Sequence, residues 1–242
     1  MIVVWFSCGV ASAVAAKMTL SRYDNVRVVN TPVLEEDADN RRFLKDVEKW
    51  LHVPIETAIH SNHPNSSAEQ IWKDGRFMSN RFGAECTRTL KKGARYQWER
   101  EHKPDWHVLG FTADEKHRFE RFKAGERENA INVLGDAGIT KEKCFEIIRD
   151  AGIKRPRLYD LGYPNANCIG CVKATSPTYW NHVRQVHPDI FKCRSDLSRE
   201  IGCKLVRIKG VMRFLDELKV TDTGRPMKDM NIDCGVFCEE KS

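Results

Sequence analysis

The sequence predicts an α/β protein with a mostly parallel sheet and a helical, cysteine-rich C-terminal region. Residues 2–6 form a short run of β-branched and aromatic residues, which is typical of a strand buried on both faces. Further apolar runs alternate with helical patterns over the first half of the chain, as in proteins built from parallel strands and crossover helices. Most of the nine cysteines lie in the second half.

The first strand leads into a turn of small residues and then into a helix that starts near residue 13. This geometry points backbone N–H groups and the positive end of a helix dipole at an anion. Gly9 allows close approach of a phosphate, Val10 lies at the turn into the helix, and Ser7 and Ser12 add hydroxyl donors. An ordinary buried turn without a ligand is the alternative. A signal-peptide core is disfavoured, because no Lys or Arg precedes the run and Lys17 follows it.

The other elements of the first half follow from apolar spacing and from start and stop residues. We expect strands at 26–30, 55–60 and 106–110, and helices at about 39–51, 66–72 and 87–102. The helix at 87–102 is basic and is weakened by Gly93. In such sheets ligands bind at the carboxyl ends of the strands, which is where the turn after the first strand lies.

The second half of the chain has a different pattern of residues and predicted elements. An amphipathic helix is expected at 140–150, a loop rich in Gly, Asn and Cys at 159–174, and helices from Pro177 and Pro188. We place a soft boundary near residue 135, between a nucleotide-binding α/β domain (1–135) and a helical C-terminal region (136–242). One integrated domain is the alternative.

Composition restricts the function classes. With 41% hydrophobic and 31% charged residues the chain is globular, and no apolar run reaches the roughly 20 residues that span a bilayer. The net charge of +6 favours anionic partners such as nucleotides or nucleic acid. An odd number of cysteines with two close pairs favours metal or redox chemistry in a reducing cytoplasm over a disulfide framework.

The sharpest local signal is Cys168-Ile169-Gly170-Cys171. Two thiolates at this spacing can bind a metal or cluster, or form a redox pair. A structural zinc site or an unliganded turn is the alternative. An iron–sulfur cluster needs three or four converging thiolates, and the candidates for the additional ligands are Cys86, Cys234 and Cys238.

Cys86 begins the basic helix, where a thiol beside cationic side chains should have a lowered pKa. Arg88, Lys91 and Lys92 are spaced so that two or three of them can face one anion. The alternative is a solvated basic face with a spectator thiol.

A charged segment follows the strand at 106–110. Arg118 could clamp a second phosphate or a sulfate there, and Asp114 or Glu115 could hold a ribose or Mg²⁺. Taken alone, such a segment is more often a plain charged helix.

The ordered motifs SCGVAS, EED, ECTRTLKK, GFTADE, NCIGCVKA and DCGVFC together resemble the phosphoadenylyl-sulfate (PAPS) reductase family. This family belongs to the adenine-nucleotide α-hydrolase (PP-loop) superfamily, and the chain is similar to the divergent members that phages often encode. The resemblance spans nearly the whole chain in the right order. It implies a Rossmann-like sheet in which Ser7, Gly9 and Ser12 contact nucleotide phosphate.

The resemblance also implies an adenine nucleotide as ligand (PAPS, adenylyl sulfate or ATP) and a [4Fe–4S] cluster, with zinc as the alternative metal. On this basis Cys234 is the nucleophile, and the metal ligands are Cys86, Cys168, Cys171 and Cys238. The chain departs from the family patterns where Cys8 replaces a Gly and Ala11 replaces the Asp of SGGxDS, and where only Cys86 precedes Thr87.

Three functions remain open at this stage. The first is a cytoplasmic reductase of adenylyl sulfate or PAPS, with thioredoxin or glutaredoxin as the thiol reductant. The second is an ATP-dependent sulfurtransferase that thiolates nucleic acid, for which the residues near Trp98, Arg100 and His102 would supply an aromatic and basic surface. The third is a non-catalytic nucleotide-binding protein. Self-association is left open.

Overall fold

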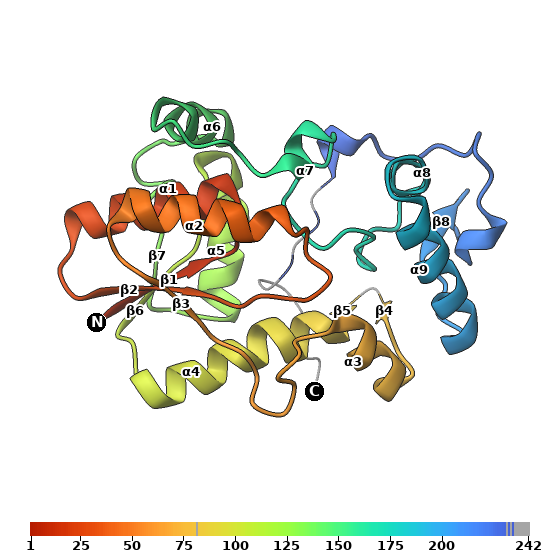
Figure 1. Cartoon of the computed structure of the whole chain (residues 1–242), viewed down its shortest axis with the longest axis horizontal. Helices are drawn as coiled ribbons and strands as arrows, with labels where there is room; N and C mark the ends of the chain where they lie inside the picture. Colours follow the sequence, from red (N-terminus) through yellow and green to blue (C-terminus); the bar gives the residue numbers. More distant parts are fainter. Residues whose placement is uncertain (81, 231, 233, 235–242) are drawn as a thin grey trace. The chain divides into compact units, whose positions relative to one another are not determined.

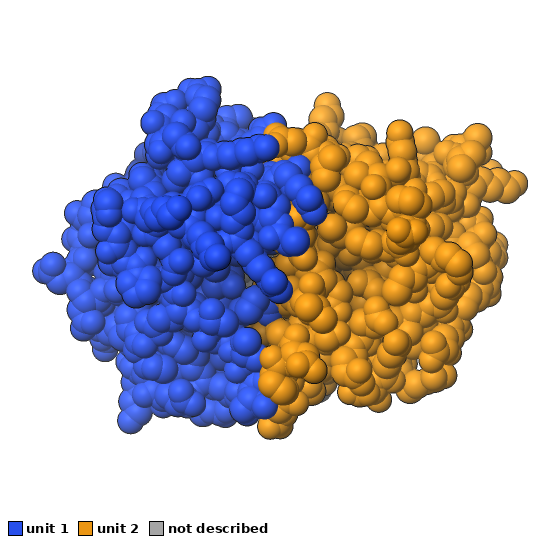
Figure 2. Space-filling model, in the orientation of Figure 1, with its two compact units in different colours: residues 1–32, 38–61, 94–157 blue, residues 33–37, 62–93, 158–242 orange. Residues whose placement is uncertain are grey.

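The computed structural model of the chain describes residues 1–80, 82–230, 232 and 234. These residues form two compact units, drawn in different colours in Figure 2. Unit 1 comprises residues 1–32, 38–61 and 94–157, and unit 2 comprises residues 33–37, 62–93 and 158–242. The units interleave along the chain instead of dividing near residue 135, because connections that leave the sheet after its second and third strands belong to unit 2.

Unit 1 contains a five-stranded sheet in the order β3-β2-β1-β6-β7, in which every neighbouring pair is parallel. Its strands are β1 (Ile2–Phe6), β2 (Val26–Asn30), β3 (Ile55–Thr57), β6 (Trp106–Val108) and β7 (Ala130–Ile131). The central strand β1 is buried along its whole length, as its unbroken apolar run predicts. The predicted α/β class is confirmed.

Five helices belong to unit 1: α1 (Val10–Arg22), α2 (Asp39–Leu51), α4 (Ala94–His102), α5 (Lys116–Gly125) and α6 (Lys141–Asp150). In Figure 1, α1, α2 and α6 lie on one side of the sheet and α4 on the other. The apolar spacing of α2 explains its orientation, since Phe43, Val47 and Leu51 recur every four residues and all are buried. A short 3₁₀ turn (Ala113–Glu115) precedes α5.

Most of the longer regular elements of unit 2 are helices. Its elements are α3 (Ala68–Gly75), β4 (Ser79–Asn80), β5 (Gly83–Ala84), a π-helix (Thr87–Gly93), α8 (Pro177–Val186), α9 (Pro188–Ile201), β8 (Val206–Ile208), β9 (Val211–Arg213) and 3₁₀ turns at Leu215–Glu217 and Met227–Asp229. The short α7 (Arg157–Asp160) lies where the chain changes from unit 1 to unit 2. The core of unit 2 gathers around the fully buried rings of Trp72, Tyr179 and Trp180.

The predicted helix at 87–102 is wrong in one respect, because residues 87–93 form a π-helix and α-helical geometry begins at Ala94. Gly93, a weak helix former, marks the change. The strand expected at 55–60 ends at Thr57. Sequence periodicity missed β7 and the β8–β9 hairpin, whose two or three residues each are too short for a periodic signal. Among the described residues, no helix is both long and apolar enough to cross a bilayer.

A buried histidine in β6 makes the stability of unit 1 sensitive to acid. His107 is 4% exposed, and its Nδ1 accepts a hydrogen bond from Nε1 of Trp5 at 3.2 Å. Burial, together with the nearby cations Arg127 and Arg95, lowers the pKa of His107 from the ordinary 6.5 to about 4. The imidazole is therefore neutral in the folded protein at neutral pH.

We expect the free energy of unfolding to fall as the pH drops from about 6.5 to about 4. Over this range the unfolded chain binds a proton at His107 and the folded chain does not, so protonation favours unfolding. Urea titrations at pH 7 and pH 4.5 measure the loss. In His107→Gln the difference between the two pH values should shrink, and an unchanged difference would contradict the assignment.

Candidate functional site

The turn after β1 is held together by one buried hydroxyl. Oγ of Ser12 donates to the Gly9 carbonyl at 2.8 Å and accepts from the backbone N–H of Ser7 at 3.1 Å. Oγ of Ser7 lies 3.2 Å from the same oxygen, and the Ser7 residue is exposed. Ser12 thus shapes the turn. Helix α1 starts at Val10, and its hydrogen bonding begins with the Ala13 amide, which donates to the Gly9 carbonyl at 3.2 Å. The amides of the three preceding residues have no acceptor one turn earlier in the helix, so they are the donors suited to an anion.

Gly110 lies against this turn. A Cβ atom at Gly110 would stand 2.6 Å from the Ser12 amide nitrogen and 2.9 Å from the Ala11 carbonyl carbon. Both neighbours are backbone atoms of the first turn of α1, so they cannot move aside as a side chain would. The absence of a side chain at Gly110 therefore allows the chain after β6 to approach the N-terminus of α1 closely.

Cys8 stands in the turn with left-handed backbone geometry, at φ 57°. Its side chain is buried, and its sulfur lies 3.7 Å from Nδ2 of Asn30, which also donates to the Phe6 carbonyl at 2.7 Å. A positive φ is strained for any residue with a Cβ and unstrained for glycine. This is a physical reason for the glycine that SGGxDS loops place at the position of Cys8.

Replacing Cys8 by glycine should give a more stable protein than replacing it by alanine, by about 1 kcal/mol, because only glycine relieves the positive φ. Urea unfolding of the two variants measures the difference. The same pair at Cys144, which is buried in the middle of α6, is the matched control. There alanine should be the more stable by about 1 kcal/mol, and the same sign at both sites would contradict the strain.

The charged side chains after β6 pair with one another at the start of α5. The guanidinium of Arg118 forms an ion pair with Glu115, whose carboxylate also accepts from the Thr112 backbone N–H at 3.1 Å. Asp114 accepts from the Lys141 backbone N–H at 3.2 Å. The structure thus places these three side chains in capping and ion-pair contacts, and their contact with phosphate, ribose or Mg²⁺ stays a prediction.

The basic residues after Cys86 belong to unit 2 and do not share one exposed face. Lys91 is buried and forms an ion pair with Glu36 at 2.5 Å, and Lys92 is buried as well. Burial alone would lower the pKa of Lys91, but the Glu36 carboxylate outweighs it and raises the pKa, so the ammonium stays charged. Arg88 pairs with Glu85 and keeps 58% of its side chain exposed.

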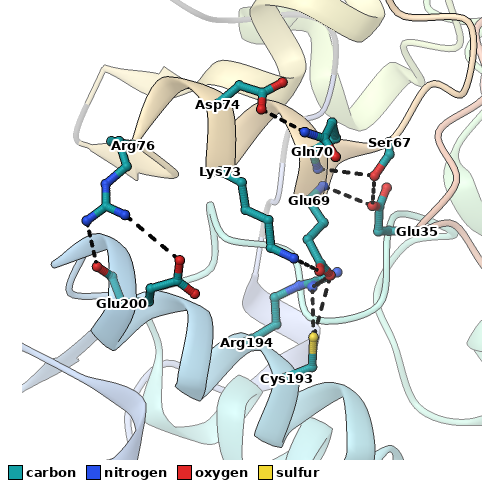
Figure 3. A network of polar contacts seen from close by, with 10 residues as sticks. All are labelled: Glu35, Ser67, Glu69, Gln70, Lys73, Asp74, Arg76, Cys193, Arg194 and Glu200. Carbon is teal, nitrogen blue, oxygen red and sulfur yellow. Dashed lines mark hydrogen bonds and ion pairs between the residues drawn. The ribbon is translucent and has the colours of Figure 1, made fainter.

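Glu36 is positioned by its neighbour Glu35. Figure 3 shows the Glu35 carboxylate at the N-terminus of α3, where it accepts from Oγ of Ser67 at 2.9 Å and from the N–H groups of Ala68 and Glu69 at 2.8 and 2.9 Å. The backbone of Glu36 forms an antiparallel bridge with Cys168. An acidic pair after β2 therefore fixes both Lys91 and the loop that carries the CxxC motif.

Local sequence patterns assign no role to Glu35 and Glu36. The only signal was the run Glu35-Glu36-Asp37 directly after the second strand, and the contacts that explain it come from distant segments.

Four thiols of unit 2 influence one another: Cys86, Cys168, Cys171 and Cys234. Burial raises the pKa of Cys171 to about 11, with Cys234 as the next cause. Burial also raises the pKa of Cys168, with Glu36 and Cys234 adding to the effect. The Cys234 sulfur lies 3.9 Å from Oγ1 of Thr87. The tail thiol is thus gathered with three thiols that are far from it in sequence.

The lowered pKa expected for Cys86 is wrong. Burial raises the pKa of this thiol, and the neighbouring Cys234 and Cys171 raise it further. The cations that were expected to lower the pKa are engaged elsewhere, because Arg88 pairs with Glu85 and Lys91 pairs with Glu36.

The donor set fits a thiolate-held group in type and number. Thiols whose pKa values are raised by burial and mutual repulsion lose their protons when a metal supplies positive charge. Within residues 1–80, 82–230, 232 and 234, however, no group of three or more Cys, His, Asp or Glu side chains is arranged so that it could hold a metal ion. Cys238, the fourth predicted ligand, lies outside the described residues.

The comparisons with known proteins bear on this site. A family model described as the phosphoadenosine phosphosulfate reductase domain matches residues 1–177. The chain belongs to this family. It is a family of nucleotide-binding enzymes of sulfur chemistry, and the match covers the turn after β1 together with Cys86, Cys168 and Cys171. Cys234 lies beyond the match.

Among solved structures, the phosphate complex of phosphoadenylyl-sulfate (PAPS) reductase from Candida auris is similar to this chain at 13% identity. The similarity covers 67% of this chain and 78% of that one, with a TM-score of 0.47. The family membership does not depend on it. No curated protein sequence matches the chain.

In this member of the PAPS reductase family, Trp98 cannot serve as an exposed stacking platform, so that expectation is wrong. Trp98 is 6% exposed, and the ring of His102 stacks on it with centroids 4.2 Å apart. The guanidinium of Arg27 lies 4.9 Å from the ring centroid. Tertiary packing in unit 1 therefore covers the aromatic face that a nucleic-acid base would need.

Proposed function

We propose that the chain is a sulfonucleotide reductase that acts on adenylyl sulfate or phosphoadenylyl sulfate. The observation that carries the proposal is the gathering of the tail thiol Cys234 with Cys86, Cys168 and Cys171 in unit 2. A thiol nucleophile placed beside other cysteines suits sulfur chemistry. Membership of the PAPS reductase family supports an adenine nucleotide as the other part of the substrate.

Nucleotide binding is assigned to the turn after β1. The first-turn amides of α1 and the exposed hydroxyl of Ser7 would bind phosphate, and Gly9 would allow its close approach. Ser12 would hold the turn in this shape from inside. The Val10 amide is predicted to contribute to the same anion site. The side chains predicted to complete it are those of Arg88, Lys91, Lys92 and Arg118.

The reaction would proceed in two displacements. The Cys234 thiolate attacks the sulfonyl sulfur, the bond from that sulfur to the phosphate oxygen breaks, and the nucleotide leaves with the electron pair. The product is an S-sulfocysteine. A thiolate of thioredoxin or glutaredoxin then attacks Sγ of Cys234, sulfite leaves with the electron pair, and the second carrier thiol resolves the mixed disulfide and restores Cys234.

In this reductase Cys86, Cys168, Cys171 and Cys238 would hold a [4Fe–4S] cluster or zinc, which leaves Cys234 as the nucleophile. Such a group would supply positive charge that stabilises neighbouring thiolates. Anaerobic purification followed by an absorbance spectrum and by iron, sulfide and zinc assays distinguishes the two metals.

The test of the function is sulfite release. Purified protein with a thioredoxin or glutaredoxin system should release sulfite and nucleotide in equal amounts from adenylyl sulfate, phosphoadenylyl sulfate or both. If neither compound yields sulfite with either carrier, the proposal is wrong.

One observation favours a second candidate, an ATP-dependent sulfurtransferase that thiolates nucleic acid. Cys234 is gathered with Cys86, Cys168 and Cys171, and as a ligand of a metal bound there it would not be a free nucleophile. This enzyme would form AMP and pyrophosphate from ATP when nucleic acid is present. The absence of both products would eliminate it.

A further inference from the structure

The chain from Leu218 onward is bound through its backbone by side chains of α8. Nδ2 of Asn181 donates to the carbonyl of Lys219 at 3.0 Å and to that of Asp222 at 2.9 Å. One turn further along α8, Nη2 of Arg184 donates to the Leu218 carbonyl at 2.7 Å. These contacts fix the path of the chain independently of which side chains the bound segment carries.

The N-terminal end of α8 extends the same attachment. Oγ of Ser176 donates to the Arg225 carbonyl at 2.9 Å, and Oγ1 of Thr178 accepts from the Gly224 N–H at 2.9 Å. The backbone at Gly224 lies close to the start of α8, since a Cβ at Gly224 would stand 2.7 Å from Cδ of Pro177. The polar side of α8 therefore binds backbone groups over residues 218–225.

A second attachment lies next to the cysteines. Nδ2 of Asn167 donates to the Ile232 carbonyl at 2.7 Å. Asn167 directly precedes Cys168 of the CxxC motif, and Ile232 is two residues before Cys234. The Ile232 side chain is 8% exposed and packs in the core of unit 2.

We propose that Asn167 and Asn181 are positioning residues for Cys234. Asn181 binds the carbonyls of Lys219 and Asp222, and Asn167 binds the carbonyl of Ile232. These two attachments, together called the latch, set the Cys234 thiol beside Cys86, Cys168 and Cys171. The catalytic role of the two residues rests on the proposed function, in which Cys234 is the nucleophile that they position. Fixing both ends of a short segment raises the effective concentration of a group that follows it.

The test uses the full-length protein, purified without oxygen, and measures how fast iodoacetamide labels each cysteine by peptide mass spectrometry. Asn167→Asp keeps the size of the side chain but replaces the amide donor with an acceptor that faces the Ile232 carbonyl. Asn181→Ala removes the other attachment. In each variant the labelling rate of Cys234, relative to the exposed Cys193, should rise about fivefold, as expected for local opening after loss of one hydrogen bond.

Asn129→Asp is the matched control, since Asn129 also donates its amide to a carbonyl, that of Asp105 at 2.6 Å, within unit 1. It should leave Cys234 labelling unchanged. The proposal is overturned if labelling of Cys234 stays at the wild-type rate in both variants. It is also overturned if Cys86, Cys168 and Cys171 accelerate by the same factor, which would indicate general loosening of unit 2.

The sulfite assay separates the latch from the function. If the wild-type enzyme releases sulfite, Asn167→Asp should lower kcat and leave the KM for the nucleotide unchanged, because Asn167 is not among the residues assigned to nucleotide binding. Equal changes in both constants would contradict a positioning role. If the wild-type protein releases no sulfite, the proposed function is wrong, and the labelling ratios still decide whether the latch exists.

Discussion

Replacing Cys234 by serine should abolish sulfite release, with a fall in kcat on the order of 10³-fold or more. A serine hydroxyl is protonated at neutral pH and is a far weaker nucleophile toward sulfur than a thiolate, so the S-sulfo intermediate cannot form. Nucleotide affinity should stay within about twofold, because Cys234 is not among the residues assigned to nucleotide binding. Sulfite and nucleotide release under single-turnover conditions, with equilibrium binding alongside, measure both effects.

Cys193→Ser is the matched control, because Cys193 is an exposed thiol of α9 and its contacts are with Glu69 and Arg194. It should retain full activity. Sulfite release that persists in Cys234→Ser would contradict the mechanism. Iron or zinc that is lost from Cys234→Ser but retained by Cys193→Ser would identify Cys234 as a ligand and favour the sulfurtransferase.

Replacing Gly110 by valine should disrupt the nucleotide turn and destabilise unit 1. The new Cβ would stand 2.6 Å from the Ser12 amide nitrogen, and the clash can be relieved only by moving the backbone after β6 or that of α1. Such overpacking costs about 3 kcal/mol. We also expect nucleotide affinity to fall at least about tenfold, because the amides that bind phosphate would be displaced by the same shift. Urea unfolding and nucleotide titration measure the two effects.

Gly125→Ala is the control for this experiment. Gly125 ends α5, and a Cβ there would meet nothing within 4 Å. Alanine at this position should leave both stability and nucleotide affinity close to wild type. Wild-type nucleotide affinity in a folded Gly110→Val protein would mean that the anion does not bind at the first turn of α1.

Local patterns predicted much of unit 1 because the signals involved are themselves local. The unbroken apolar run of β1 requires burial on both faces, and the four-residue spacing in α2 requires one buried face. The turn at 7–12 was predicted as a phosphate-binding turn from its small residues, and its geometry depends on contacts within six residues.

The sequence by itself determined the α/β class, the approximate positions of the main strands and helices of the first half, and the CxxC motif. Only the tertiary structure decided that Lys91 pairs with Glu36, that Trp98 is covered, and that Cys86 has a raised pKa. The reason is physical: periodicity and turn chemistry act between residues that are near in sequence. Ion pairing, desolvation and the meeting of Cys234 with the CxxC loop depend on which distant segments pack together.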